Sequence, residues 1–103
     1  MDSILKSEDT DGTDPYDTLA YIVGSQYRQL IVSELSSGPA TPTNMAEAHD
    51  VHVSHVSRGL GELADRGVVS AYGTDSRTRL YRLTEHGKTV AKLLDEYEEG
   101  END

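Results

Sequence analysis

The chain has 103 residues, 35% of them hydrophobic, a formal net charge of −10, and neither cysteine nor tryptophan. A chain of this length has room for one small domain. The missing cysteines exclude disulfides, thiolate zinc sites and iron–sulfur clusters, and no stretch approaches the ~18 consecutive apolar residues of a membrane span. We therefore expect a soluble cytoplasmic protein with one domain at residues 14–97 and unstructured acidic tails at 1–13 and 98–103.

The charges are distributed unevenly along the chain. Residues 1–50 carry a net charge of −7 and residues 93–103 one of −6, whereas residues 51–92 carry +3. A basic segment in an acidic chain is typical of a contact with nucleic acid. The acid-rich, lysine-poor composition is also similar to that of proteins from halophiles, whose acidic surfaces stay hydrated in molar salt. An ordinary acidic protein is the alternative.

Capping signals predict the first helices. Asp14 followed by Pro15 is typical of a helix start. Gly24 interrupts the apolar pattern, and Ser25 can cap a second stretch that ends in the SSGP sequence at 36–39. The two stretches form either one kinked helix or two helices.

A short helix, a turn and a longer helix are predicted next. Thr41-Pro42 repeats the capping signal and opens a helix to about Ala48, after which Val51 is placed to fill the angle of the turn. The helix expected at 52–66 contains Gly59 and Gly61, each costing about 1 kcal/mol relative to alanine. Its apolar stripe at helical spacing predicts four core residues: Val53, Val56, Leu60 and Leu63. This order of elements is the helix-turn-helix pattern.

A hairpin and a final helix complete the domain. Residues 68–72 and 79–83 have the alternation of strands and flank a polar loop at 73–78 that bears arginine. Thr84 is placed to cap a short last helix, whose apolar stripe comprises Val90, Leu93, Leu94 and Tyr97. A helix that ends in a glycine turn and leads into a basic hairpin suits insertion into a DNA groove.

Four segments together resemble the winged helix-turn-helix regulators of the ArsR and MarR type, especially small haloarchaeal members. They are GSQYRQLIVSEL at 24–35, TPTNMAEAHDV at 41–51, HVSRGLGELADRGVV at 55–69 and RLYRLTEHG at 79–87. The resemblance implies an α+β, mostly α fold: a winged helix-turn-helix with a two-stranded β-wing and a C-terminal helix. It covers most of residues 15–97, and the glycines at 59 and 61, the acidic balance and the short last helix depart from the pattern.

The predicted function is sequence-specific binding of double-stranded DNA by a transcription regulator. The side of the helix at 52–66 opposite its apolar stripe would enter the major groove, and the hairpin at about 68–83 would contact the backbone or minor groove. The candidate DNA-binding residues are Thr43, Asn44, Ser54, His55, Ser57, Arg58, Arg77 and Arg79. A homodimer would place two recognition helices in successive major grooves. Its candidate interface residues are Leu19, Ile22, Val90, Leu94 and Tyr97.

Other functions remain as alternatives. Net acidity favours a winged-helix module that binds protein, although the acidic residues avoid the predicted helix and wing. A ligand or metal sensor on the same scaffold is the other alternative, because His49, His52 and His55 are spaced three apart. We expect no metal and no cofactor. An enzyme is not expected, since no phosphate-binding glycine loop or nucleophile motif is present.

Overall fold

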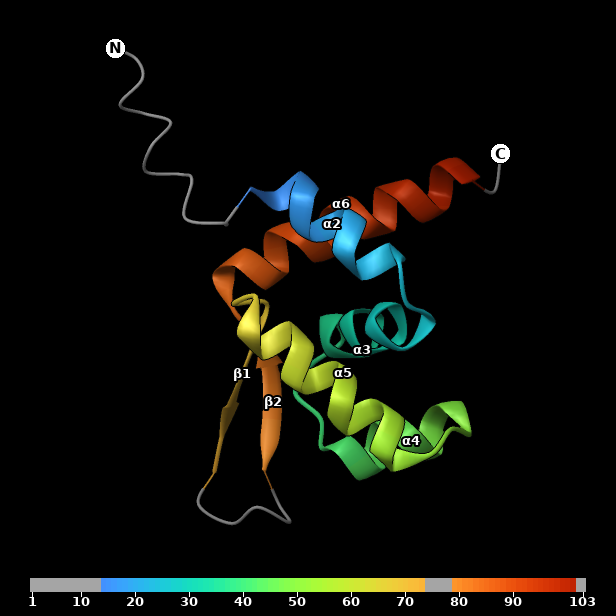
Figure 1. The fold of residues 1–103 in the computed structure, drawn as a ribbon, viewed down its shortest axis with the longest axis vertical. Helices are drawn as coiled ribbons and strands as arrows, with labels where there is room; N and C mark the ends of the chain where they lie inside the picture. The colour runs from blue at the N-terminus through green and yellow to red at the C-terminus, as the bar shows by residue number, and fades with distance from the viewer. Residues whose placement is uncertain (1–13, 74–78, 102–103) are drawn as a thin grey trace.

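The computed structural model describes residues 14–73 and 79–101, with side chains to residue 98. Its elements in chain order are α2 (Pro15–Val23), α3 (Gln26–Ser36), α4 (Pro42–His49), α5 (Val53–Asp65), β1 (Val69–Tyr72), β2 (Leu80–Leu83) and α6 (Glu85–Glu101). α2 packs across α6 at one end of the molecule, and α3 and α5 pack together below them (Figure 1). The hairpin extends away from α6, toward the end at which α4 and α5 meet (Figure 1).

Side-chain caps begin four of the described helices where the sequence predicts them. Asp14 accepts from the backbone amide of Tyr16, Ser25 from that of Arg28, and Thr41 from that of Asn44. Thr84 Oγ1 accepts from the Gly87 amide at 2.9 Å. Because Ser25 has extended backbone angles and opens a new hydrogen-bonded turn, residues 15–36 form two helices rather than one kinked helix.

The turn between α4 and α5 is built as predicted around Val51. Asp50 ends α4 in the left-handed region, with φ of 55°, and the Val51 amide donates to the Ala46 carbonyl. Val51 is half-buried against the core. This geometry directs α5 across α3 and α4, as expected for a helix-turn-helix.

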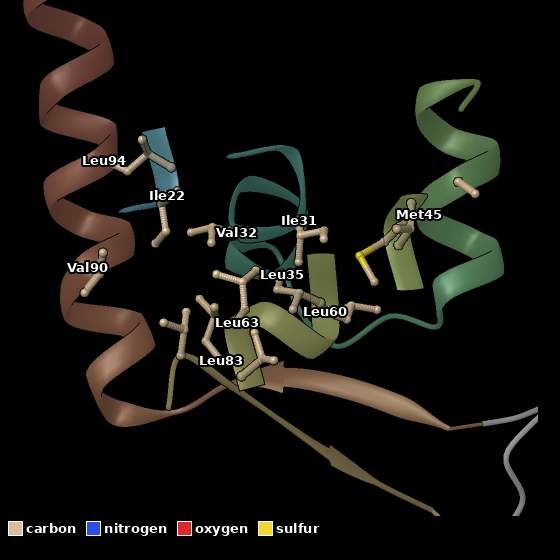
Figure 2. Packing of buried hydrophobic residues seen from close by; sticks show 14 residues of the cluster. Ile22, Ile31, Val32, Leu35, Met45, Leu60, Leu63, Leu83, Val90 and Leu94 are labelled. Carbon is tan, nitrogen blue, oxygen red and sulfur yellow. The ribbon is translucent and has the colours of Figure 1, made fainter. Parts of the chain in front are cut away.

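One hydrophobic cluster joins the elements, and α3 and α5 contribute most of its centre (Figure 2). Three of the four core residues predicted in α5, Val56, Leu60 and Leu63, are fully buried. The prediction for Val53 is wrong, because its side chain is 45% exposed. Val53 is the first helical residue, so no preceding helical turn lies beneath its side chain, and Val51 fills the inward position instead.

The hairpin has the predicted antiparallel pairing, with Val69 opposite Leu83 and Tyr72 opposite Leu80. Ala40 adds a bridge on the other side of β2, through paired backbone hydrogen bonds with Tyr81 of 3.2 and 2.9 Å. The sequence does not predict this bridge, because a single residue has no alternating pattern of apolar and polar side chains. It ties the segment before α4 to the wing, the name we give to the hairpin β1–β2.

The last helix is longer than predicted. α6 runs for 17 residues to Glu101, so the acidic segment expected to be an unstructured tail from residue 98 is helical through Glu101. Val90 and Leu94, two residues of its predicted apolar stripe, face the core of this chain. The other predicted tail, residues 1–13, lies outside the described residues.

Two glycines allow close contacts between elements. A Cβ on Gly59 would lie 2.7 Å from Cδ1 of the buried Ile31, so this glycine lets α5 approach α3. A Cβ on Gly87 would lie 2.1 Å from the Val68 carbonyl oxygen, which packs against the first turn of α6. Gly61 differs, because nothing within 4 Å would meet its Cβ.

Candidate nucleic-acid interface

The side of α5 opposite the core is open to solvent. Its exposed residues include four predicted DNA-binding side chains, Ser54, His55, Ser57 and Arg58, together with Gly61. At 100° per residue, Ser54, Arg58 and Gly61 lie almost opposite the buried stripe, while His55 and Ser57 flank them. Within the described residues, no carboxylate forms an ion pair with Arg58. Its guanidinium is therefore available to an outside acceptor.

One flank of α5 is held against α2 and α3 by three side-chain pairs. The His55 ring stacks on Tyr27, with ring centroids 4.7 Å apart and planes inclined by 12°. Further along, Glu62 Oε1 lies 3.0 Å from Arg28 Nη1. At the end of the helix, the Arg66 guanidinium lies 3.9 Å from the centre of the Tyr21 ring. These pairs fix the rotation of α5 about its axis.

The Arg28 side chain is central to this flank. Its Nε and Nη2 donate to the Tyr21 carbonyl at 2.9 and 2.6 Å, and its guanidinium stacks 3.8 Å from the centre of the Tyr21 ring. The Tyr21 ring thus contacts two arginines, Arg28 and Arg66. These supporting residues could not be predicted from the sequence, because Arg28 is an isolated base in an acidic segment and no periodic pattern marks a partner 34 residues away.

A hollow of about 340 Å³ lies beside the contact between the start of α3 and α5. Its lining includes Ser25, Tyr27, His55 and Arg58. The hollow adjoins the open face of α5 and brings two predicted DNA-binding residues, His55 and Arg58, to one place.

The start of α5 differs from the other described helix starts. Its N-cap residue, His52, makes no side-chain capping hydrogen bond. The His52 carbonyl accepts from the His55 amide at 3.1 Å, but the first amides of this helix receive no side-chain acceptor from their N-cap residue, and the positive end of the helix dipole faces outward. A helix start of this kind can accept an anionic group such as a phosphate.

The start of α4 carries Thr43 and Asn44, both exposed. Asn44 Oδ1 accepts a hydrogen bond from Thr41 at 2.8 Å, which leaves its amide NH₂ directed to an outside acceptor. Thr41 itself is occupied by capping, so its role here is structural.

Exposed Arg79 lies immediately before β2 of the wing. Arg82 is directed differently, since its guanidinium lies 5.0 Å from the centre of the Tyr72 ring. The predicted contact residue Arg77 lies outside the described residues. On α6, Lys88 pairs with Glu85 at 3.5 Å, as expected for a salt-bridged helix face.

The three histidines of the metal-sensor alternative do not form a cluster. His49 Nε2 pairs with Glu34 at 3.0 Å, whereas the His52 and His55 rings lie 6.0 Å apart and His55 stacks on Tyr27. Among the residues the structure describes, no group of three or more potential metal ligands is found.

Of the five predicted dimer-interface residues, three are core residues of this chain. Ile22 and Val90 are fully buried and Leu94 is 2% exposed, so these side chains are not available to a partner surface. They face inward because α2 and α6 bury their apolar stripes on each other and on α3. Leu19 is partly buried and Tyr97 is 43% exposed, and these two remain predictions for a dimer contact.

Helix, short helix, turn, longer helix, hairpin and closing helix, in this spatial arrangement, define a winged helix-turn-helix protein. The fold class predicted from the sequence is confirmed. Residues 16–102 match the HVO_A0261 N-terminal domain family, and the chain belongs to this family.

Solved structures with the winged helix-turn-helix fold of the ArsR and MarR type superpose on the chain. A mutant of ZitR from Lactococcus lactis has a TM-score of 0.68 at 23% identity and covers 74% of this chain and 53% of ZitR. The adhesin competence repressor AdcR from Streptococcus pyogenes has a TM-score of 0.67 at 20% identity, and the match covers 74% of this chain and 58% of AdcR. HlyU from Vibrio cholerae has a TM-score of 0.69 at 18% identity, and the match covers 85% of this chain and 96% of HlyU.

Another ZitR mutant, crystallised in complex with DNA, gives a TM-score of 0.65 at 23% identity, with 74% of this chain and 53% of that chain covered. The chain thus spans little more than half the length of ZitR and AdcR.

No curated protein matches the sequence. None of the helices in the described ranges combines the length and hydropathy that crossing a bilayer requires.

Proposed function

We propose that this protein is a sequence-specific, double-stranded DNA-binding transcription regulator without enzymatic activity, acting in the cytoplasm. The observation that carries the proposal is the open face of α5. It presents Ser54 and Arg58 away from the core on a helix whose rotation is fixed by neighbouring side chains. The fold shared with a ZitR mutant crystallised with DNA supports the same function.

In the proposed complex, α5 lies in the major groove with its N-terminal half toward the bases. Arg58 donates two hydrogen bonds to a guanine edge, while Ser54, Ser57 and His55 bond bases or phosphates. The amide of Asn44 and the hydroxyl of Thr43 contact the DNA backbone. Arg77 and Arg79 contact either the DNA backbone or the minor groove.

We also propose that two chains pair through α2 and α6, with contacts that include Leu19 and Tyr97. A two-fold dimer would place the recognition helices about 34 Å apart, in successive turns of the groove. Sedimentation equilibrium measures the assembly state directly, and a strictly monomeric chain in the DNA complex would contradict the pairing.

The test is binding to a randomised pool of labelled duplexes, followed by sequencing of the bound fraction. We expect a recurring motif and a dissociation constant at least ~1,000-fold lower for that motif than for scrambled duplex. Binding without enrichment of any motif would contradict sequence specificity. Failure to bind any duplex in KCl from about 0.1 M, where the Debye length is about 10 Å, to about 1 M, where it is about 3 Å, would contradict DNA binding altogether.

A second candidate function is a winged-helix module that binds protein, and the net charge of −10 favours it. An acidic body repels phosphates at low salt. The same duplex experiment separates the two functions, because a protein-binding module would enrich no DNA motif.

A further inference from the structure

Val53 is an exposed aliphatic side chain at the start of α5. Four large hydrophobic residues of the described chain are exposed: Val53, Tyr16, Tyr72 and Tyr97. The three tyrosines each have a hydroxyl that water can solvate. Val53, at 45% exposure, has no polar atom, so its position at the first residue of α5 needs a separate explanation.

The surroundings of Val53 do not cover it. Ser54 and Ser57, one and four residues further along, are both exposed and short. The Cα–Cβ bonds of an α-helix tilt toward its N-terminus, so the Val53 side chain extends beyond the first turn. His52, the N-cap residue, makes no side-chain capping hydrogen bond at this end of the helix. The N-terminal end of α5, which would enter the major groove of DNA, therefore exposes the aliphatic side chain of Val53.

The chemistry of the major groove identifies what such a tip can contact. The edges of the base pairs carry hydrogen-bond donors and acceptors and a single apolar group, the C5-methyl of thymine. An aliphatic side chain packed on that methyl removes apolar surface from water on both partners. Packed on cytosine, which lacks the methyl, the same side chain would face a polar amino group.

We propose that Val53 is a specificity-determining residue that packs against the C5-methyl group of a thymine in the bound site. The inference rests on the proposed DNA-binding function and adds the identity of one base. Ser54 and Ser57 are small enough to let the valine reach the floor of the groove, and Arg58, five residues further along and about 140° around the helix axis, contacts a neighbouring base pair.

The experiment uses the full chain and the tightest duplex selected from the randomised pool. Each thymine of the site is replaced singly by deoxyuridine, which removes the methyl group and keeps every hydrogen-bonding atom. We expect one position per half-site at which the replacement weakens wild-type binding about fourfold, as expected for loss of one buried methyl contact. In Val53→Ala, the two duplexes should bind equally, within twofold.

Arg58→Ala is the matched control, since it removes a different proposed base contact on the same helix. It should weaken binding overall while retaining the fourfold response to deoxyuridine. Wild-type binding that responds to no methyl removal, or a Val53→Ala variant that keeps the full response, would overturn the inference. Both of these outcomes leave the proposed function intact, whereas absence of motif-specific binding by the wild type would overturn that function and the inference with it.

Discussion

Arg28 and Glu62 form an ion pair between α3 and α5, with 3.0 Å between Nη1 and Oε1. The same guanidinium donates twice to the Tyr21 carbonyl at the end of α2. A single arginine therefore holds three helices in register around the proposed recognition helix. The Arg28 side chain is 15% exposed and that of Glu62 is 36% exposed, so the arginine is the more buried partner.

Removing this arginine should loosen the domain. Arg28→Ala removes the Glu62 ion-pair partner and two donors to the Tyr21 carbonyl, which keeps the 3.3 Å bond from the Gly24 amide. We expect a loss of about 2 kcal/mol in the free energy of unfolding. Glu62→Ala should cost under about 1 kcal/mol, because that carboxylate is partly solvated. Urea unfolding followed by circular dichroism, at constant KCl, measures both values. Equal losses in the two variants would contradict the central role of Arg28.

The two glycines of α5 should respond oppositely to alanine. Gly59→Ala places a methyl 2.7 Å from Ile31 Cδ1 in a filled core, and we expect a net destabilisation of about 1 kcal/mol after the gain in helix propensity. Gly61→Ala meets nothing within 4 Å and should stabilise the fold by about 1 kcal/mol. Thermal unfolding of the two variants against the wild type checks the pair. The same sign for both changes would show that the packing of α5 on α3 is misassigned.

Gly87→Ala should be the most damaging of the glycine substitutions. Its new Cβ would lie 2.1 Å from the Val68 carbonyl oxygen, which is fixed in place by a 2.9 Å hydrogen bond from the Thr84 amide. Since backbone must move to relieve this contact, we expect a loss of about 2–3 kcal/mol. The exposed Thr89 on the same helix supplies the control, and Thr89→Ala should change the unfolding midpoint only slightly.

Arg58 and Arg79 should affect DNA binding in different ways. Arg58→Ala should weaken binding to the selected site by about 1–3 kcal/mol and relax base preference at one position. Arg79→Ala should weaken binding to all duplexes alike. It should also change the slope of log affinity against log salt concentration by the amount expected for the loss of about one phosphate contact. Fluorescence anisotropy with the selected and scrambled duplexes distinguishes the two patterns. If neither variant changes affinity, α5 and the wing are not the contact surface.

The salt dependence of DNA binding should be weak or inverted. A body with a net charge of −10 repels DNA at low salt. At about 1 M salt the Debye length falls to ~3 Å, so that repulsion is screened while short-range contacts persist. Affinities measured across a KCl series test this expectation. A steep fall of affinity with added KCl would contradict it.

Local signals account for the parts of the fold that were predicted correctly. Asp14, Ser25, Thr41 and Thr84 each begin a helix because their side chains bond amides two or three residues away. Spacing between neighbours in sequence likewise predicts Val56, Leu60 and Leu63 in the core. The exposure of Ser54 and Arg58 followed from the same periodicity, whereas their contact with DNA remains a proposal.

The sequence by itself therefore determined the order, the caps and the type of the elements, because these depend on interactions within a few residues, and the resemblance of four segments to known regulators indicated the winged helix-turn-helix class. Only the tertiary structure decided that Val53 is exposed, that Ile22, Val90 and Leu94 are core rather than interface, and that Gly59 serves helix packing. It also decided the partners of Arg28 and Tyr27, which come from other helices. Each of these depends on which distant segment covers a residue, and helical periodicity contains no information about that covering segment.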